Sequence, residues 1–160
     1  MNYTNAFLFL IATCLLYSCS GKVIDNEAPD VYDLRWFDHP DIENDPGGDI
    51  VDGGNYTIGI ESGFHIVLKV WDEVGFEYTE AYLLLNGDPE IRRDFIRNGD
   101  MSYGTKNVSA SLSIRTGNEL WITGDRRYTL EAGDTYEFYI KFVDIYGNTT
   151  EMFWTADIVE

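Results

Sequence analysis

Hydrophobic and polar residues alternate with a period of two along most of the chain after residue 30. The clearest case lies over 108–115, where Val108, Ala110, Leu112 and Ile114 alternate with serines and an arginine. Alternation puts the two sets on opposite faces of a strand, so one face is expected to be buried. The same pattern predicts strands over 64–71, 80–85, 136–142 and 149–159. Only residues 90–97 could instead form a short helix.

Turn-forming residues separate these segments. Asn86-Gly87 closes the segment 80–85, and glycine, aspartate and asparagine recur in the other connections, as tight turns require. Several short strands with this spacing predict an all-β domain, and a β-sandwich in particular.

The N-terminal segment has the pattern of an export signal. Residues 6–16 are an uncharged apolar run, which is too short to span a bilayer comfortably. The following Leu16-Tyr17-Ser18-Cys19 resembles the bacterial lipobox, in which the signal is cut before a lipid-modified cysteine. The resemblance implies a signal peptide over 1–18, a lipid on Cys19 that anchors the chain in the membrane, and a tether over 19–29. The alternative is an ordinary secretory signal that contains Cys19 by coincidence.

Three short motifs resemble parts of immunoglobulin-like domains. Residues 130–136, which end in Tyr136, resemble the tyrosine corner, and 144–149 resembles the last turn of many bacterial immunoglobulin-like domains. Residues 72–75 are similar in form to 144–149 and would be the turn between the second and third strands of such a domain. With the lipobox, residues 25–160 resemble immunoglobulin-like lipoproteins common in Bacteroidota. This implies a Greek-key immunoglobulin-like β-sandwich of about seven strands over 30–160. The residues after Cys19 resemble surface-export signals of such lipoproteins, which implies an outer-membrane protein exposed on the cell surface.

Composition excludes some classes of partner and chemistry. Asp and Glu number 28 against 11 Lys and Arg, for a net charge of −17, so nucleic acid is not expected as a partner. Both cysteines, Cys14 and Cys19, lie near the N-terminus, so no disulfide is expected within the domain. The two histidines, His39 and His65, belong to no catalytic motif, and the chain is not expected to be an enzyme.

One acidic loop has the spacing of a calcium-binding loop. Carboxylates occupy offsets 1, 3, 5, 9 and 12 from residue 41, as in an EF-hand; these are Asp41, Glu43, Asp45, Asp49 and Asp52. Pro46 stands where an EF-hand needs glycine, and no helices flank the loop. The alternative is a solvated acidic loop between two strands.

A second candidate calcium site follows from topology. In a Greek-key sandwich the start of the first strand lies at the same end as the turns over 72–75 and 144–149. That arrangement gathers Asp25, Glu27, Asp72 and Asp144. Aspartate is also a common turn former, so these residues could serve the turns alone. No other cofactor is expected.

The opposite end holds the aromatic residues Trp36, Phe37 and Trp121, which could bind a glycan or a protein partner, or could belong to the core. The sequence therefore predicts a membrane-anchored, non-enzymatic binding or adhesion module. The alternative is a structural accessory subunit of a cell-envelope complex that has no soluble ligand.

Overall fold

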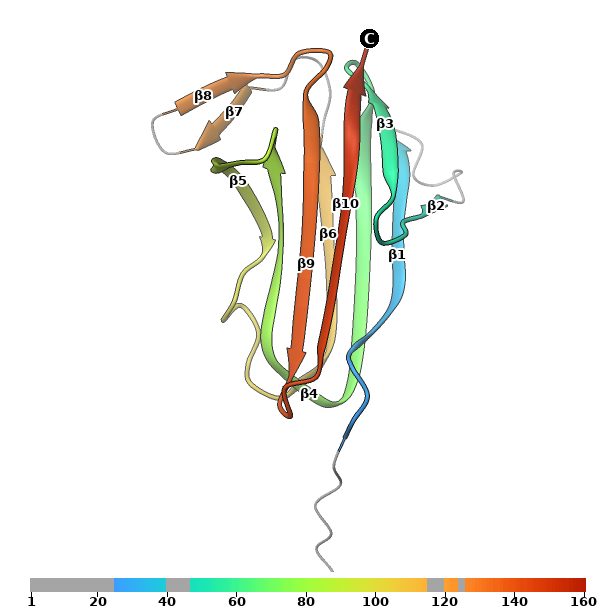
Figure 1. Ribbon diagram of the computed structural model, residues 1–160, viewed down its shortest axis with the longest axis vertical. Coiled ribbons are helices and arrows are strands. Elements are labelled where there is room, and N and C mark those ends of the chain that lie inside the picture. The colour runs from blue at the N-terminus through green and yellow to red at the C-terminus, as the bar shows by residue number, and fades with distance from the viewer. Residues whose placement is uncertain (1–24, 40–46, 115–119, 124–125) are drawn as a thin grey trace, which may run out of the picture.

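The fold is entirely β in the part of the chain that the structure, a computed structural model, describes, namely residues 25–39, 47–114, 120–123 and 126–160 (Figure 1). The strands are β1 (Asp30–His39), β2 (Gly48–Asp49), β3 (Asn55–Gly59), β4 (Gly63–Leu85), β5 (Asp88–Ile96), β6 (Thr105–Ile114), β7 (Leu120–Thr123), β8 (Arg126–Thr129), β9 (Thr135–Asp144) and β10 (Thr149–Val159). The all-β prediction is confirmed. A helix over 90–97 is wrong, because this stretch pairs with the end of β4 as β5.

The 23-residue strand β4 organises the sheet. Its first part pairs with β1 and β6, and its second part, from Phe76 onward, pairs with β5 and β9. The register shifts between Trp71 and Phe76, where Gly75 has a φ of +96°. The sequence predicts a turn between two strands here. The chain instead bends and continues as one strand, because its hydrogen bonds pass from one pair of neighbours to another.

This bend joins eight strands into one sheet. The order is β2-β1-β4-β9-β10-β3, with β5 and β6 also paired to β4 and with β3 parallel to β10. The sheet is mixed and strongly curled, so the strands form a half-barrel and not two clearly separate sheets (Figure 1). Strands β7 and β8 form a separate hairpin.

The core lies inside the curl. Alternate residues of β4, β6 and β9 point inward, and the alternation predicted from the sequence is confirmed for Phe64, Ile66, Leu68 and Val70. Phe138 stacks on Trp154 with ring centroids 5.1 Å apart, and Phe64 packs edge-on against Phe138. Aromatic rings therefore fill the space that the curled sheet encloses.

Within the described part of the chain, no helix has the length and apolar character needed to cross a bilayer.

Candidate functional site

Three aspartates predicted to meet at one end of the domain do lie together. Asp25 precedes β1, Asp72 lies at the bend of β4, and Asp144 ends β9. One carboxylate oxygen from each lies within 4.8 Å of the others, and this group is called the acidic cluster below. Asp72 and Asp144 are buried, and Asp25 is half-buried.

Local hydrogen bonds hold the two buried carboxylates in place. Asp72 Oδ1 accepts bonds from the backbone amides of Val74 and Gly75 at 2.9 and 2.7 Å. Asp144 Oδ1 accepts from the amides of Tyr146 and Asn148, both at 2.8 Å. These are the turn-forming roles that aspartate commonly takes. They satisfy part of each carboxylate and fix its direction.

Asn148 joins the cluster to the segment before β1. Its Nδ2 donates to Asp144 Oδ2 at 2.6 Å and to the carbonyl oxygen of Asp25 at 3.0 Å. The amide of Ile145 also donates to the carbonyl of Gly75 at 3.0 Å. Three segments that are distant in sequence are thereby connected at one end of the sheet, called the tether end below.

The acidic cluster has no basic counter-charge among the described residues, since none of the ion pairs there includes Asp25, Asp72 or Asp144. Buried carboxylates this close repel each other when both are charged, and calcium is bound by such oxygens. Calcium binding by these residues stays a prediction.

We expect millimolar calcium to raise the melting temperature by several degrees relative to excess EDTA. An ion present at a hundred times its dissociation constant stabilises the folded state by about 2.7 kcal/mol. The substitution Asp25→Asn keeps an oxygen for the amide of Glu27 but removes a charge, so it should reduce the shift. The exposed Asp30→Asn should preserve it. Equal midpoints for the wild-type protein in calcium and in EDTA would retire the calcium interpretation.

The remaining predicted calcium ligands are more dispersed. Glu27 is exposed and does not belong to the acidic cluster. Asp49 is exposed on β2 opposite Arg35 of β1, and Asp52 Oδ1 accepts the backbone amide of Phe153 at 2.8 Å. The other three acids of that loop, Asp41, Glu43 and Asp45, lie outside the described residues, as does Cys19.

Two of the three aromatic residues predicted as a ligand platform, Trp36 and Phe37, pack within the protein. Phe37 is buried, and the ring of Trp36 lies 6.2 Å from that of Tyr56. Gly47 and Gly48 lie directly against these rings, because a Cβ there would come within 2.6 Å of Phe37 and 2.4 Å of Trp36. Packing therefore accounts for both rings without a ligand. The side chain of Trp121, on β7, lies outside the described residues.

Of the two histidines, His65 has a described side chain, and its Nδ1 lies 2.7 Å from Ser113 Oγ on the neighbouring strand β6. The side chain of His39 lies outside the described residues.

The outer face of β4, β9 and β10 carries a groove that the sequence did not predict. Its volume is about 430 Å³, within the usual range for ligand sites. One wall is a row of three rings from neighbouring strands, Tyr82, Tyr139 and Phe153, called the ring row below. Tyr82 and Tyr139 stack with centroids 5.1 Å apart, and Tyr139 and Phe153 lie 4.9 Å apart.

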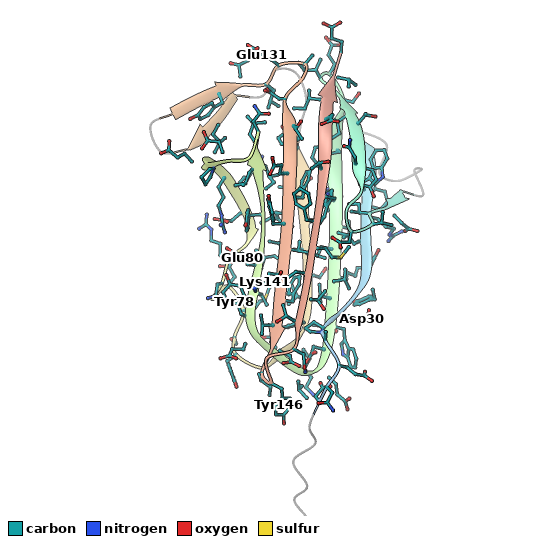
Figure 2. The ribbon with its side chains drawn as sticks, in the orientation of Figure 1. Asp30, Tyr78, Glu80, Glu131, Lys141 and Tyr146 are labelled. Carbon is teal, nitrogen blue, oxygen red and sulfur yellow. The ribbon has the colours of Figure 1, made fainter. Side chains whose placement is uncertain are left out.

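Charged side chains from the same strands form the other wall. Glu80, Lys141 and Glu151 face each other across β4, β9 and β10, two residues from the ring row along each strand. Figure 2 shows Glu80 and Lys141 close together over the sheet. Lys141 pairs with Glu151, and Arg92 of β5 pairs with Glu80. The Arg92 guanidinium also lies 3.6 Å from the centre of the Tyr82 ring, so it extends the ring row by a cation–π contact.

Neighbouring groups set the protonation states in this groove. Burial raises the pKa of Glu80, but hydrogen bonds from Arg92 and Tyr78 outweigh it, and the net pKa is lowered. Burial raises the pKa of Tyr139 to about 12, helped by its hydrogen bond to Glu137. At neutral pH the groove therefore offers the charged carboxylate of Glu80 and the protonated phenol of Tyr139.

One sequence signal could have located this groove. Tyr82, Tyr139 and Phe153 occupy outward positions of strands whose inward positions are already apolar. An aromatic residue at an expected polar position is a candidate surface contact. Their alignment in one row depends on strand register, which the sequence did not reveal.

Comparison with known proteins found no protein family and no curated protein that matches this chain.

Proposed function

We propose that this protein is a non-enzymatic binding module that holds a neutral glycan in the groove of the outer sheet face. The observation that carries the proposal is the ring row, which forms one wall of the groove opposite a row of charged side chains. Sugars present apolar C–H groups, which pack against aromatic rings, and hydroxyl groups, which bond to polar side chains. A groove with one aromatic and one polar wall matches both properties.

The charges in the groove favour a neutral ligand. Lys141 is paired with Glu151, Glu80 with Arg92, and Asp52 with a backbone amide. An ionic ligand would have to compete with one of these pairs. A hydroxyl group both donates and accepts, so it can bond to a carboxylate or an ammonium that keeps its partner.

The location in the cell belongs to the same proposal. A lipid on Cys19 would anchor the protein in the outer membrane, with the domain outside the cytoplasm and exposed on the cell surface. The described segment that begins at Asp25 enters the domain at the tether end, whereas the groove lies on an outer face of the sheet. An anchored protein would thus leave the groove open to an extended polymer.

We also propose that the curled sheet is a variant of the immunoglobulin-like sandwich. The pairings β1-β4-β6 and β5-β4-β9-β10-β3 fit the two layers of such a fold if the bend of β4 serves as the crossing between them. This interpretation concerns the fold and names no ligand, because such folds host many unrelated functions.

Affinity electrophoresis in native gels tests the glycan proposal. The protein, with a net charge of −17, migrates readily, and gels containing neutral xylan, mannan, β-glucan or starch would retard it if the polymer binds. We expect at least one of these polymers to retard the wild-type protein. The substitution Tyr139→Ala, which removes the central ring, should weaken that binding about tenfold or more, the size expected at the centre of a binding site.

Two further variants complete this test. Tyr103→Ala removes a more exposed ring, which is 71% accessible and lies away from the groove, and should leave retardation unchanged. Tyr139→Phe keeps the ring and should retain most of the affinity. Equal loss in the Tyr103 and Tyr139 variants, or no retardation by any of the polymers, would contradict a glycan site at the ring row.

A further inference from the structure

Exposed aromatic side chains gather at the tether end of the molecule. Among the described residues, four large aromatic side chains outside the groove are strongly exposed; their accessible fractions are 55% for Tyr32, 43% for Trp71, 71% for Tyr103 and 43% for Tyr146. Single exposed rings are normal on a protein surface, whereas several gathered at one end mark a contact with a partner or a membrane.

Backbone contacts place these rings around the same bend of β4. Trp71 immediately precedes the bend. Tyr103 adjoins Gly104, whose amide donates to the carbonyl of Phe76 just after the bend. Tyr146 lies in the turn between β9 and β10, at the lower end of the molecule in Figure 2.

Tyr32 reaches the same end from β1. It occupies an irregularity in the pairing of β1 with β4, between Val31 opposite Val70 and Asp33 opposite Lys69. Tyr32 is thus next to Val31, whose partner Val70 immediately precedes Trp71 in β4. The four rings therefore lie around the tether end and do not share one face of the sheet.

The segment before β1 is fixed to this end as well. The Asn148 side chain donates to the carbonyl of Asp25, and the Thr150 hydroxyl donates to the carbonyl of Pro29. Cys19 precedes Asp25 by six residues, which can span at most about 21 Å when fully extended. A lipid on Cys19 would hold the tether end within that distance of the membrane surface.

We propose that Tyr32, Trp71, Tyr103 and Tyr146 rest in the interfacial region of the bilayer to which Cys19 is anchored. The inference depends on the lipid anchor of the proposed function. Tryptophan and tyrosine favour this region, where the ring meets the acyl boundary and its N–H or O–H stays near water. The contact would orient the domain upright, with the groove directed sideways.

The charged side chains at the tether end indicate which kind of lipid surface it would contact. Glu27, Asp30, Glu73 and Glu77 are exposed at this end together with Lys106, so acidic side chains are in excess and an anionic surface would repel them. The contact is therefore expected on zwitterionic phosphatidylcholine and is expected to weaken as phosphatidylglycerol is added.

Quenching of tryptophan fluorescence by brominated lipid tests the contact. The full chain would be produced in a Gram-negative host, purified from its membranes, and reconstituted in vesicles of phosphatidylcholine brominated at acyl positions 6 and 7. The emission of Trp71 is the difference between the wild-type protein and Trp71→Phe. We expect this emission to be quenched relative to vesicles without bromine.

A matched variant moves the exposed tryptophan to the opposite end. Val159 is 42% exposed and is the last residue of β10, at the opposite end of that strand from the turn between β9 and β10. Figure 1 shows the C-terminus at the end of the molecule away from that turn. In the double variant Trp71→Phe/Val159→Trp, the introduced tryptophan should not be quenched. Equal quenching at the two positions would overturn the proposed orientation.

The mass of the N-terminal peptide from the same sample tests the lipid anchor separately from the membrane contact of the rings. If Cys19 carries acyl chains and Trp71 is not quenched, the membrane contact is wrong and the anchor stands. If Cys19 is unmodified, the anchor is wrong, and the inference that depends on it fails as well.

Discussion

Replacing Gly75 with alanine is expected to lower the free energy of unfolding by more than about 3 kcal/mol. Gly75 has a φ of +96°, and a Cβ there would lie 2.4 Å from the carbonyl oxygen and 2.5 Å from the carbonyl carbon of Gly104. Both contacts are with backbone, so no side-chain rotation can relieve them. The strain of a positive φ costs about 1–2 kcal/mol, and the clash adds to it. Urea unfolding of the variant measures the sum.

Gly147→Ala is the matched control for this substitution. Gly147 has a φ of +90° in the neighbouring turn, but nothing lies within 4 Å of the position of its Cβ. The Gly147→Ala variant should therefore lose only the part of the unfolding free energy that comes from the positive φ, about 1–2 kcal/mol. Similar losses for the two variants would contradict a close backbone approach at the bend of β4.

Replacing Asp144 with alanine is expected to cost about 3 kcal/mol or more of unfolding free energy. The side chain is fully buried and accepts three hydrogen bonds, from the amides of Tyr146 and Asn148 and from Asn148 Nδ2. Hydrogen bonds to a charged group each contribute about 1.5–3 kcal/mol, and the donors left behind would lack an acceptor. Urea unfolding in excess EDTA isolates this effect from any bound ion.

The substitution Asp144→Asn separates the role of this side chain in the turn from the effect of its charge. The amide oxygen of asparagine can still accept the two backbone amides, so in EDTA the loss should be smaller than for alanine. If the acidic cluster binds calcium, the stabilisation by calcium should shrink in this variant because one carboxylate charge is gone. An alanine variant as stable as the wild-type protein would show that the turn over 144–149 does not depend on this carboxylate.

Local pattern predicted the strands well, because burial on one face of a strand imposes a period of two on the sequence. The segments that contain Phe64, Leu112 and Phe138 were recognised in this way. The bend of β4 was read as a turn, since Asp72 and Gly75 are turn-forming residues. A turn and a sharp bend use the same local chemistry, and the neighbours that pair on each side decide between them.

The acidic cluster and the ring row differ in how far the sequence could locate them. The meeting of Asp25, Asp72 and Asp144 was expected from the Greek-key topology that the immunoglobulin resemblance implied. That topology also placed Glu27 with them, and Glu27 does not belong to the acidic cluster. The ring row was missed. Tyr82, Tyr139 and Phe153 lie on three strands, and a register shift of one residue in any strand would turn its ring toward the core.

The sequence by itself determined the all-β class and the inward faces of the main strands. Both depend on periodicity, which is a property of the linear chain. Only the tertiary structure decided that β4 continues through its bend, that Phe37 is buried beneath glycine, and that three rings align beside a groove. These features depend on register and on packing between distant segments, because cross-strand partners are chosen by the whole core and not by any one strand.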